Sequence, residues 1–224
     1  MMGAGSSFPV DLILFGMIAA FLVLRLRSIL GRRTGFERQT PPYQPPAAQN
    51  APAPVIDGQA EPQPAAATRA VPEPASALGQ TLEQMRTVNQ AFDPAGFLNG
   101  AEQAFRMIVA AFAAGDRQTL RTLLADDTYR AFEQAIAARE AANQTQVSAI
   151  HAIRSMTIEN AELRGSVATI TVRFVSDQIS LTQDKDGNPV VGTDAVTEIT
   201  DIWAFERDLT QSDPVWRLVS ARSA

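Results

Sequence analysis

Few residues of this chain have the types and spacing that enzymes use. His151 is the only histidine and there is no cysteine, which excludes a Cys–His pair and a thiolate metal site. Tyr129, His151 and Asp201 remain as acids or bases that an isomerase-like domain would bury in an apolar pocket. Nothing in the sequence shows that the three converge. We expect no catalytic residues and no enzyme activity, with a small-molecule-binding or isomerase-like domain as the alternative.

A metal or cofactor site is not expected either. The stretch Asp184–Asn188 reads DKDGN and starts like a calcium loop. Such a loop needs glycine in sixth place and glutamate in twelfth, but here glycine is fourth and Ala195 is twelfth. We predict a hairpin turn instead. The sequence also has no phosphate-binding glycine loop and no nucleophile elbow.

An apolar run near the N-terminus predicts a membrane anchor. Residues 8–24 carry a single charge, Asp11, and a hydrocarbon core needs roughly 17–25 apolar residues. A signal peptide would have basic residues before the run and a small-residue cleavage site after it, but residues 1–7 have no basic side chain. A buried core helix would lack an adjoining partner. The anchor is therefore assigned to Leu12, Leu14, Phe15, Phe21, Leu24 and their neighbours.

The basic segment 25–40 that follows the run predicts the orientation. It holds five arginines and one acidic residue, Glu37. Loops rich in arginine stay cytoplasmic, so the N-terminus should lie outside and the rest of the chain in the cytoplasm. We expect anionic lipid headgroups to contact the arginines, at about 1 kcal/mol each. These residues are Arg25, Arg27, Arg32 and Arg33.

Composition divides the remaining chain into a linker and one domain. Ten of the 14 prolines fall between Pro41 and Pro74, so residues 41–77 are predicted to form a disordered, proline- and alanine-rich spacer. Residues 78–224 suit one domain. They hold 13 basic and 19 acidic residues, a net charge of −6. Such a domain repels phosphate backbones, so we expect no nucleic-acid partner.

The domain begins with a helical pattern. Apolar residues between Leu78 and Phe92 predict a short amphipathic helix, which lies either on the membrane or on its own domain. Asp93-Pro94 predicts the start of a longer helix that ends at Gly115. Further helical pieces are expected after Asp116 and over 128–142.

From Val147 onward the apolar period changes to two, which is typical of strands. Four are expected, over 150–163, 168–174, 196–205 and 215–219. Helices followed by antiparallel strands predict an α+β fold in which helices pack on a curved four-stranded antiparallel sheet. The residues expected to line its core or a pocket are Phe105, Ile108, Phe112, Phe132, Ile170, Val172, Phe174 and Trp203.

Five stretches in order resemble a known family: FDPAGFLNGA from Phe92, AFRMIVAAFAAGD from Ala104, AIAARE from Ala135, ITVRFV from Ile170 and TDIWAFERD from Thr200. They are similar to the C-terminal domain of the mitochondrial inner-membrane translocase subunit 44, in its bacterial TimA-like branch. The resemblance implies a nuclear-transport-factor-like cone with a large apolar pocket and no established catalytic residues. The mitochondrial relative is a peripheral adaptor that recruits a DnaK-type chaperone to the protein-conducting channel and contacts anionic lipid.

Together these patterns predict a non-enzymatic adaptor anchored in a bacterial inner membrane, with its N-terminus periplasmic and its domain cytoplasmic. It should bind a membrane or translocating protein segment, or lipid. Unlike the mitochondrial relative, the chain carries its own span and lacks a long charged N-terminal region, which leaves chaperone recruitment undecided. A purely structural homo-oligomer, marked by an exposed apolar patch on the sheet, is a further alternative.

Overall fold

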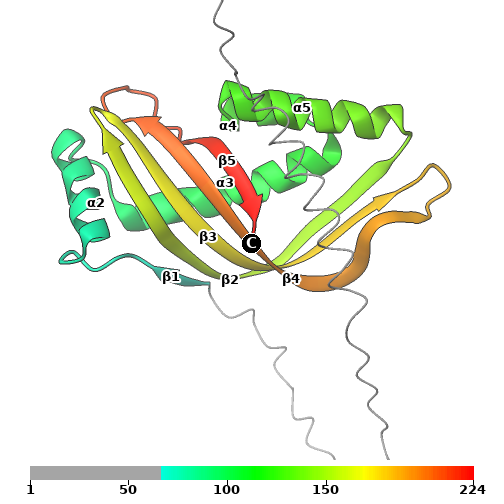
Figure 1. Ribbon diagram of the computed structural model, residues 1–224, viewed down its shortest axis with the longest axis horizontal. Coiled ribbons are helices and arrows are strands. Elements are labelled where there is room, and N and C mark those ends of the chain that lie inside the picture. Colours follow the sequence, from blue (N-terminus) through cyan, green and yellow to red (C-terminus); the bar gives the residue numbers. More distant parts are fainter. Residues whose placement is uncertain (1–66) are drawn as a thin grey trace, which may run out of the picture. The chain divides into compact units, whose positions relative to one another are not determined.

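The computed structural model describes residues 67–224, where four helices and five strands form an α+β fold (Figure 1). The predicted anchor 8–24, the basic segment 25–40 and the linker as far as residue 66 lie outside the described residues. None of the helices within 67–224 is long and apolar enough to cross a membrane. In chain order the elements are β1 (Thr68–Ala70), α2 (Ala77–Val88), α3 (Pro94–Ala114), α4 (Arg117–Leu123), α5 (Asp126–Ala141), β2 (Thr145–Arg164), β3 (Val167–Gln183), β4 (Pro189–Asp208) and β5 (Arg217–Ser223).

Side-chain caps set the helix boundaries where the sequence predicts them. The Asp93 carboxylate accepts a hydrogen bond from the Gly96 N–H at 2.7 Å, and Pro94 occupies the first helical position of α3. Gly115 ends α3 in the left-handed conformation, with φ 71°, which a side chain would disfavour. Asp116 then caps α4 by accepting from the Thr119 N–H. The charged and glycine residues between the apolar stripes therefore separate α3 from α4.

The sheet has the order β1-β2-β3-β4-β5, and its last four strands pair antiparallel. The prediction of four strands is wrong by one, because β1 adds to β2 as a short parallel strand. This strand lies inside the segment 41–77 that was predicted to be a disordered linker. Three residues are too few to show an alternating pattern, so β1 has no signature in the sequence.

The strands run longer than the alternating pattern predicts. The pairing of β2 with β3 shifts register near Ile150, Ile153 and Ile158, and each shift moves side chains to the other face. The predicted turn at Asp184–Asn188 is confirmed: the Asp184 carboxylate accepts from the Asp186 and Asn188 N–H groups and joins β3 to β4. Bulges and bends hide part of the strand periodicity from the sequence.

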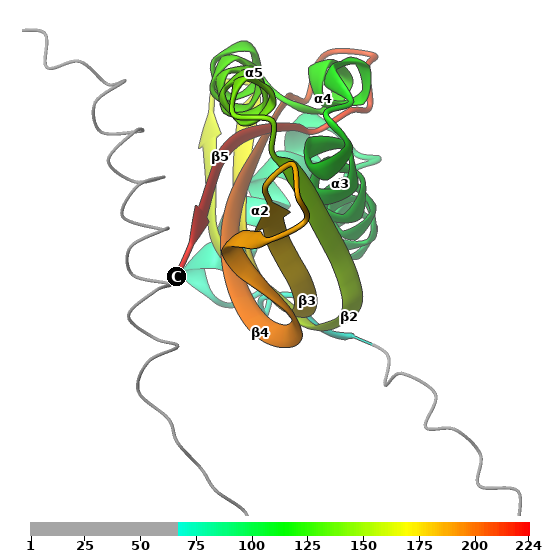
Figure 2. The ribbon, with the colours of Figure 1, turned by 90° about the vertical axis from the view of Figure 1, so that its right-hand side faces the viewer.

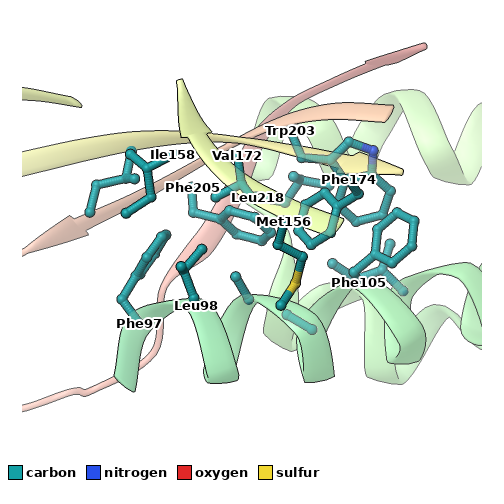
Figure 3. Close-up of a cluster of buried hydrophobic side chains, with 14 of the residues drawn as sticks. Phe97, Leu98, Phe105, Met156, Ile158, Val172, Phe174, Trp203, Phe205 and Leu218 are labelled. Carbon is teal, nitrogen blue, oxygen red and sulfur yellow. The ribbon is translucent and has the colours of Figure 1, made fainter. Parts of the chain in front are cut away.

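The core lies between α3 and the inner face of the bent sheet (Figures 2 and 3). Phe105 of α3 stacks on Phe174 of β3 with ring centroids 4.4 Å apart, and Trp203 of β4 meets Phe105 edge-on at 4.6 Å. Six of the eight residues predicted to line the core or a pocket are buried. The other two, Phe112 and Phe132, are half-buried and meet edge-on at the end of the layer.

Replacement of Phe105 by alanine should lower the free energy of unfolding by about 3–5 kcal/mol, because it removes a fully buried ring and leaves a cavity against Phe174. Urea unfolding followed by tryptophan fluorescence measures the change. Met107→Ala, two residues along and 46% exposed, is the control and should change stability by less than about 0.5 kcal/mol. Equal losses for both variants would contradict this account of the core.

Candidate functional site

An open groove of about 350 Å³ lies between α3 and the loop that joins β4 to β5. We call it the α3–loop groove. Apolar and small side chains make up most of its lining, and Asp93, Gln103 and Arg207 are its polar members. Its apolar and glycine lining includes Gly96, Phe97, Gly100, Met107, Leu123, Val215 and Trp216.

The groove is hollow because α3 presents small residues there. Gly96, Gly100, Gln103 and Met107 follow one another at helical spacing on one side of the helix. A Cβ added at Gly100 would meet no atom within 4 Å, so the space above this glycine is open. Met107 extends the same stripe and is 46% exposed.

The opposite wall is residues 209–216, and several contacts fix it. The Asn89 side-chain amide donates to the Leu209 carbonyl at 3.0 Å, and the Arg207 guanidinium donates to the Asp213 carbonyl at 3.0 Å. Trp216 packs edge-on against Phe97 with centroids 4.8 Å apart. The loop is therefore tied to α2's end, to β4 and to α3, so the groove is pre-formed.

Asp208 organises the start of this loop. Its carboxylate accepts hydrogen bonds from the Thr210 hydroxyl at 2.7 Å and the Thr210 N–H at 3.0 Å. The Thr210 hydroxyl first of all, and then the Thr210 N–H and the Ser166 and Gln211 side chains, lower the pKa of Asp208 from 3.8 to about 2. The loop is thus held by the charged form of this carboxylate.

The rim of the groove exposes apolar surface. Met107 is 46% exposed and Val215 is 38% exposed, and both line the groove. Grouped apolar side chains beside polar ones are typical of interaction sites. The exposed apolar lining therefore supports binding of an apolar group.

A larger hollow, of about 530 Å³, lies on the outer face of the sheet and is mostly polar. Glu159 in its lining pairs with Arg173, while Arg222 approaches from β5. Ile202 and Ala204 are its two apolar members. We favour the α3–loop groove as the binding site because burial of apolar surface there drives association, whereas ionic and polar groups on the sheet are already solvated or paired.

The three candidates for an isomerase-like site lie on three different elements, α5, β2 and β4. Tyr129 is buried on α5, and its hydroxyl donates to Glu133 at 2.9 Å; this hydrogen bond raises the pKa of Tyr129. Asp201 on the inner sheet face accepts from the Ser223 hydroxyl at 2.7 Å and the Gln178 amide at 3.1 Å. His151 is an exposed residue at a register shift in β2.

Strand register separates His151 from Asp201. Asp201 pairs with Phe174, and Phe174 pairs with Met156 on β2. His151 stands five residues before Met156, or about 16 Å along a strand at the usual rise. These two side chains therefore do not share one pocket.

The eight residues predicted to line the core or a pocket lie in the packed core or against it. Phe105, Phe174 and Trp203 contact one another directly, and none of these eight residues borders either hollow described above. The groove itself was missed from the sequence. Its signal was the spacing of Gly96 and Gly100 on α3, but its other wall includes Val215 and Trp216, which were assigned to a strand that begins only at Arg217.

The sequence profile of the Tim44-like domain matches residues 78–223. The chain belongs to the Tim44-like domain family. Membership indicates a Tim44-like role, in protein translocation or as an adaptor. Within residues 67–224 of this Tim44-like protein, no group of three or more His, Cys, Asp or Glu side chains could hold a metal ion. No curated protein sequence matches the chain.

Solved structures show distant likenesses to this Tim44-like chain. The intermembrane-space region of the chloroplast protein ARC6 aligns with 12% identity and a TM-score of 0.42, over 59% of this chain and 96% of that one. A putative dehydratase of the NTF2-like family from Streptomyces avermitilis aligns with 13% identity and a TM-score of 0.36, over 58% and 97%. An NTF2-like protein from Cytophaga hutchinsonii aligns with 10% identity and a TM-score of 0.33, over 59% of this chain and 98% of that one. Likeness at this level carries no functional conclusion.

The hydrogen bonds at Asp208 predict an acid-dependent loss of stability. Because the folded pKa of Asp208 is about 2 and its ordinary value is 3.8, its contribution is present above about pH 4 and is lost as the pH falls through 2. Asp208→Asn should be less stable than wild type above pH 4, and the difference should shrink toward pH 2. Urea midpoints at pH 2–6 measure this.

A second measurement tests the contribution of the Thr210 hydroxyl, which donates to the Asp208 carboxylate. Thr210→Ala removes the hydrogen bond that lowers the pKa most, so carbon-13 NMR should show the Asp208 titration midpoint moving up toward 3.8. A wild-type midpoint already near 3.8 would contradict the geometry at the start of the loop.

Proposed function

We propose that this Tim44-like protein is a non-enzymatic, membrane-anchored adaptor of the bacterial TimA-like branch. Residues 8–24 form its single span in the inner membrane, with the N-terminus periplasmic and residues 78–224 in the cytoplasm. The α3–loop groove binds an apolar segment of a membrane or translocating protein. The observation that carries the proposal is an open, pre-formed apolar groove on a Tim44-like domain.

The dimensions of the groove fit one or two apolar side chains of a polypeptide. Its volume of about 350 Å³ is at the small end for ligand sites, and its open form admits a continuing chain. Asp93, Gln103 and Arg207 in its lining can hydrogen-bond the backbone of such a segment. A leucine-sized side chain contributes about 1.5–3 kcal/mol on burial, which alone is weaker than millimolar binding.

A tether compensates for such weak binding. The anchor and the linker would keep the domain within reach of membrane proteins, and tethering to one surface raises the effective concentration without any new contact. The acidic charge of residues 78–224, −6, disfavours anionic lipid as the ligand of the groove. In this proposal lipid headgroups contact Arg25, Arg27, Arg32 and Arg33 instead.

A photo-crosslinking amino acid at position 107 of the full chain should capture a protein partner in intact membranes. The same residue at position 147 is the matched control, since Val147 is 47% exposed and lies outside the groove. Gly100→Phe should abolish the adduct from position 107, because the ring fills the open space above α3. Mass spectrometry identifies the captured protein.

Crosslinking from position 107 in two Gly100 variants tests whether the groove is the binding site. Gly100→Ala adds one methyl group without a clash and should keep most of the crosslink, while raising helix stability by up to about 1 kcal/mol. An adduct that survives Gly100→Phe, or equal capture from positions 107 and 147, would show that the groove is not the binding site.

The anchor has its own test. Leu14→Arg together with Phe21→Arg places two charges in the proposed span, each costing about 2.5–3.5 kcal/mol at a bilayer centre. The doubly substituted chain should leave the carbonate-washed membrane fraction, whereas Leu14→Ile with Phe21→Leu should stay in it. Retention of both forms would contradict a span at residues 8–24.

A further inference from the structure

β1 is a minimal strand on the edge of a much longer one. Thr68, Arg69 and Ala70 pair in parallel with Ser155, Met156 and Thr157, and all three β1 residues are exposed. β2 is 20 residues long, and no other strand within residues 67–224 pairs with this edge (Figure 1). Unpaired backbone groups on such an edge are a template for a further strand.

One ion pair connects β1 to the helical layer. The Arg69 guanidinium donates to the Glu102 carboxylate of α3 at 2.6 Å. Register explains the contact, because Arg69 pairs with Met156, a core residue that faces α3. Glu102 is 18% exposed at its side chain, so this pairing is less screened than one at an open surface.

Glu102 has a second partner that does not depend on β1. Arg106, one turn further along α3, donates to the same carboxylate at 3.1 Å and 3.2 Å. If β1 leaves, Arg106 remains beside Glu102, so no half-buried charge is left without a partner. Detachment then costs three residues of pairing, one ion pair and the packing of the half-buried Ala67 against the core, which is little enough for the segment to exchange.

We infer that the β2 edge is a strand-addition site that β1 occupies in cis and that an extended segment of another polypeptide occupies in trans. The segment adds in parallel beside Ser155–Thr157. It carries arginine or lysine between two small residues, and the basic side chain contacts Glu102. This surface lies on a different side of α3 from the groove stripe, so the inference stands without the proposed groove function.

The chemistry of the occupant follows from β1 itself. Thr68 and Ala70 share their face with Ser155 and Thr157, where small residues suffice, while the central position faces an acidic side chain. Main-chain hydrogen bonds supply affinity in strand addition, and the alternating side chains supply selectivity. The acidic balance of residues 78–224, 13 basic against 19 acidic, favours a basic segment.

The test uses the full chain and a synthetic peptide with the sequence of residues 64–72, PAAATRAVP. In the wild type, β1 competes for the edge, and the apparent affinity falls with the fraction of edge that is free. Arg69→Glu repels Glu102 and frees the edge, so the peptide should bind this variant about tenfold tighter than wild type. Fluorescence anisotropy of the labelled peptide measures the dissociation constant.

A charge swap distinguishes displacement of β1 by the peptide from a general destabilisation of the domain. Adding Glu102→Lys to Arg69→Glu restores an ion pair in cis and removes the acidic contact for the peptide, so binding should return to the wild-type level or below. A peptide with glutamate in place of its arginine should not bind the Arg69→Glu variant. Unchanged tryptophan fluorescence verifies folding of every variant.

Two results would overturn the inference. One is equal peptide affinity for wild type and Arg69→Glu. The other is equal peptide affinity for Arg69→Glu and for the double variant Arg69→Glu with Glu102→Lys. Hydrogen exchange gives an independent readout: the peptide should slow exchange of the amides at 155–157 in Arg69→Glu, and unchanged exchange there would also overturn it.

Discussion

The packing of α3 against the inner face of the sheet is the interaction on which the rest of the structure depends. Phe105 is fully buried between Phe174 and Trp203, and aromatic contacts of this kind add to the burial of apolar area (Figure 3). This contact fixes the rotation of α3 about its own axis. It thereby decides which residues of the helix remain available to other elements.

The two sides of α3 that flank this buried stripe explain both candidate surfaces. One side of α3 faces the β4–β5 loop and carries Gly96, Gly100, Gln103 and Met107. A groove remains there because the two glycines have no side chain. Glu102 lies away from that stripe and meets β1. One helix therefore supports a core, a groove and an ionic contact, and a rotation of α3 would disturb all three.

The sequence predicts the elements with strong local signals and misses what depends on contacts between elements. Asp93, Pro94 and Gly115 mark the ends of α3, and the alternation around Ile170 marks β3, because caps and periodicity act over a few residues. β1 is held by the edge of β2 and by Glu102, which lie far from it in the sequence. The groove depends on where Trp216 packs, and the rings of Phe105, Phe174 and Trp203 contact one another in the core, which periodicity does not encode.

The charge distribution gives the proposed arrangement a physical logic. Arginines crowd residues 25–38, whereas residues 78–224 carry a net charge of −6. At an anionic membrane surface the first group is attracted and the second is repelled over about a Debye length, roughly 8 Å at physiological salt. An acidic domain tethered beyond that distance would keep its apolar groove from lipid and leave it open to protein segments. In the proposed arrangement weak sites suffice, because the tether would supply the local concentration that a single apolar contact lacks.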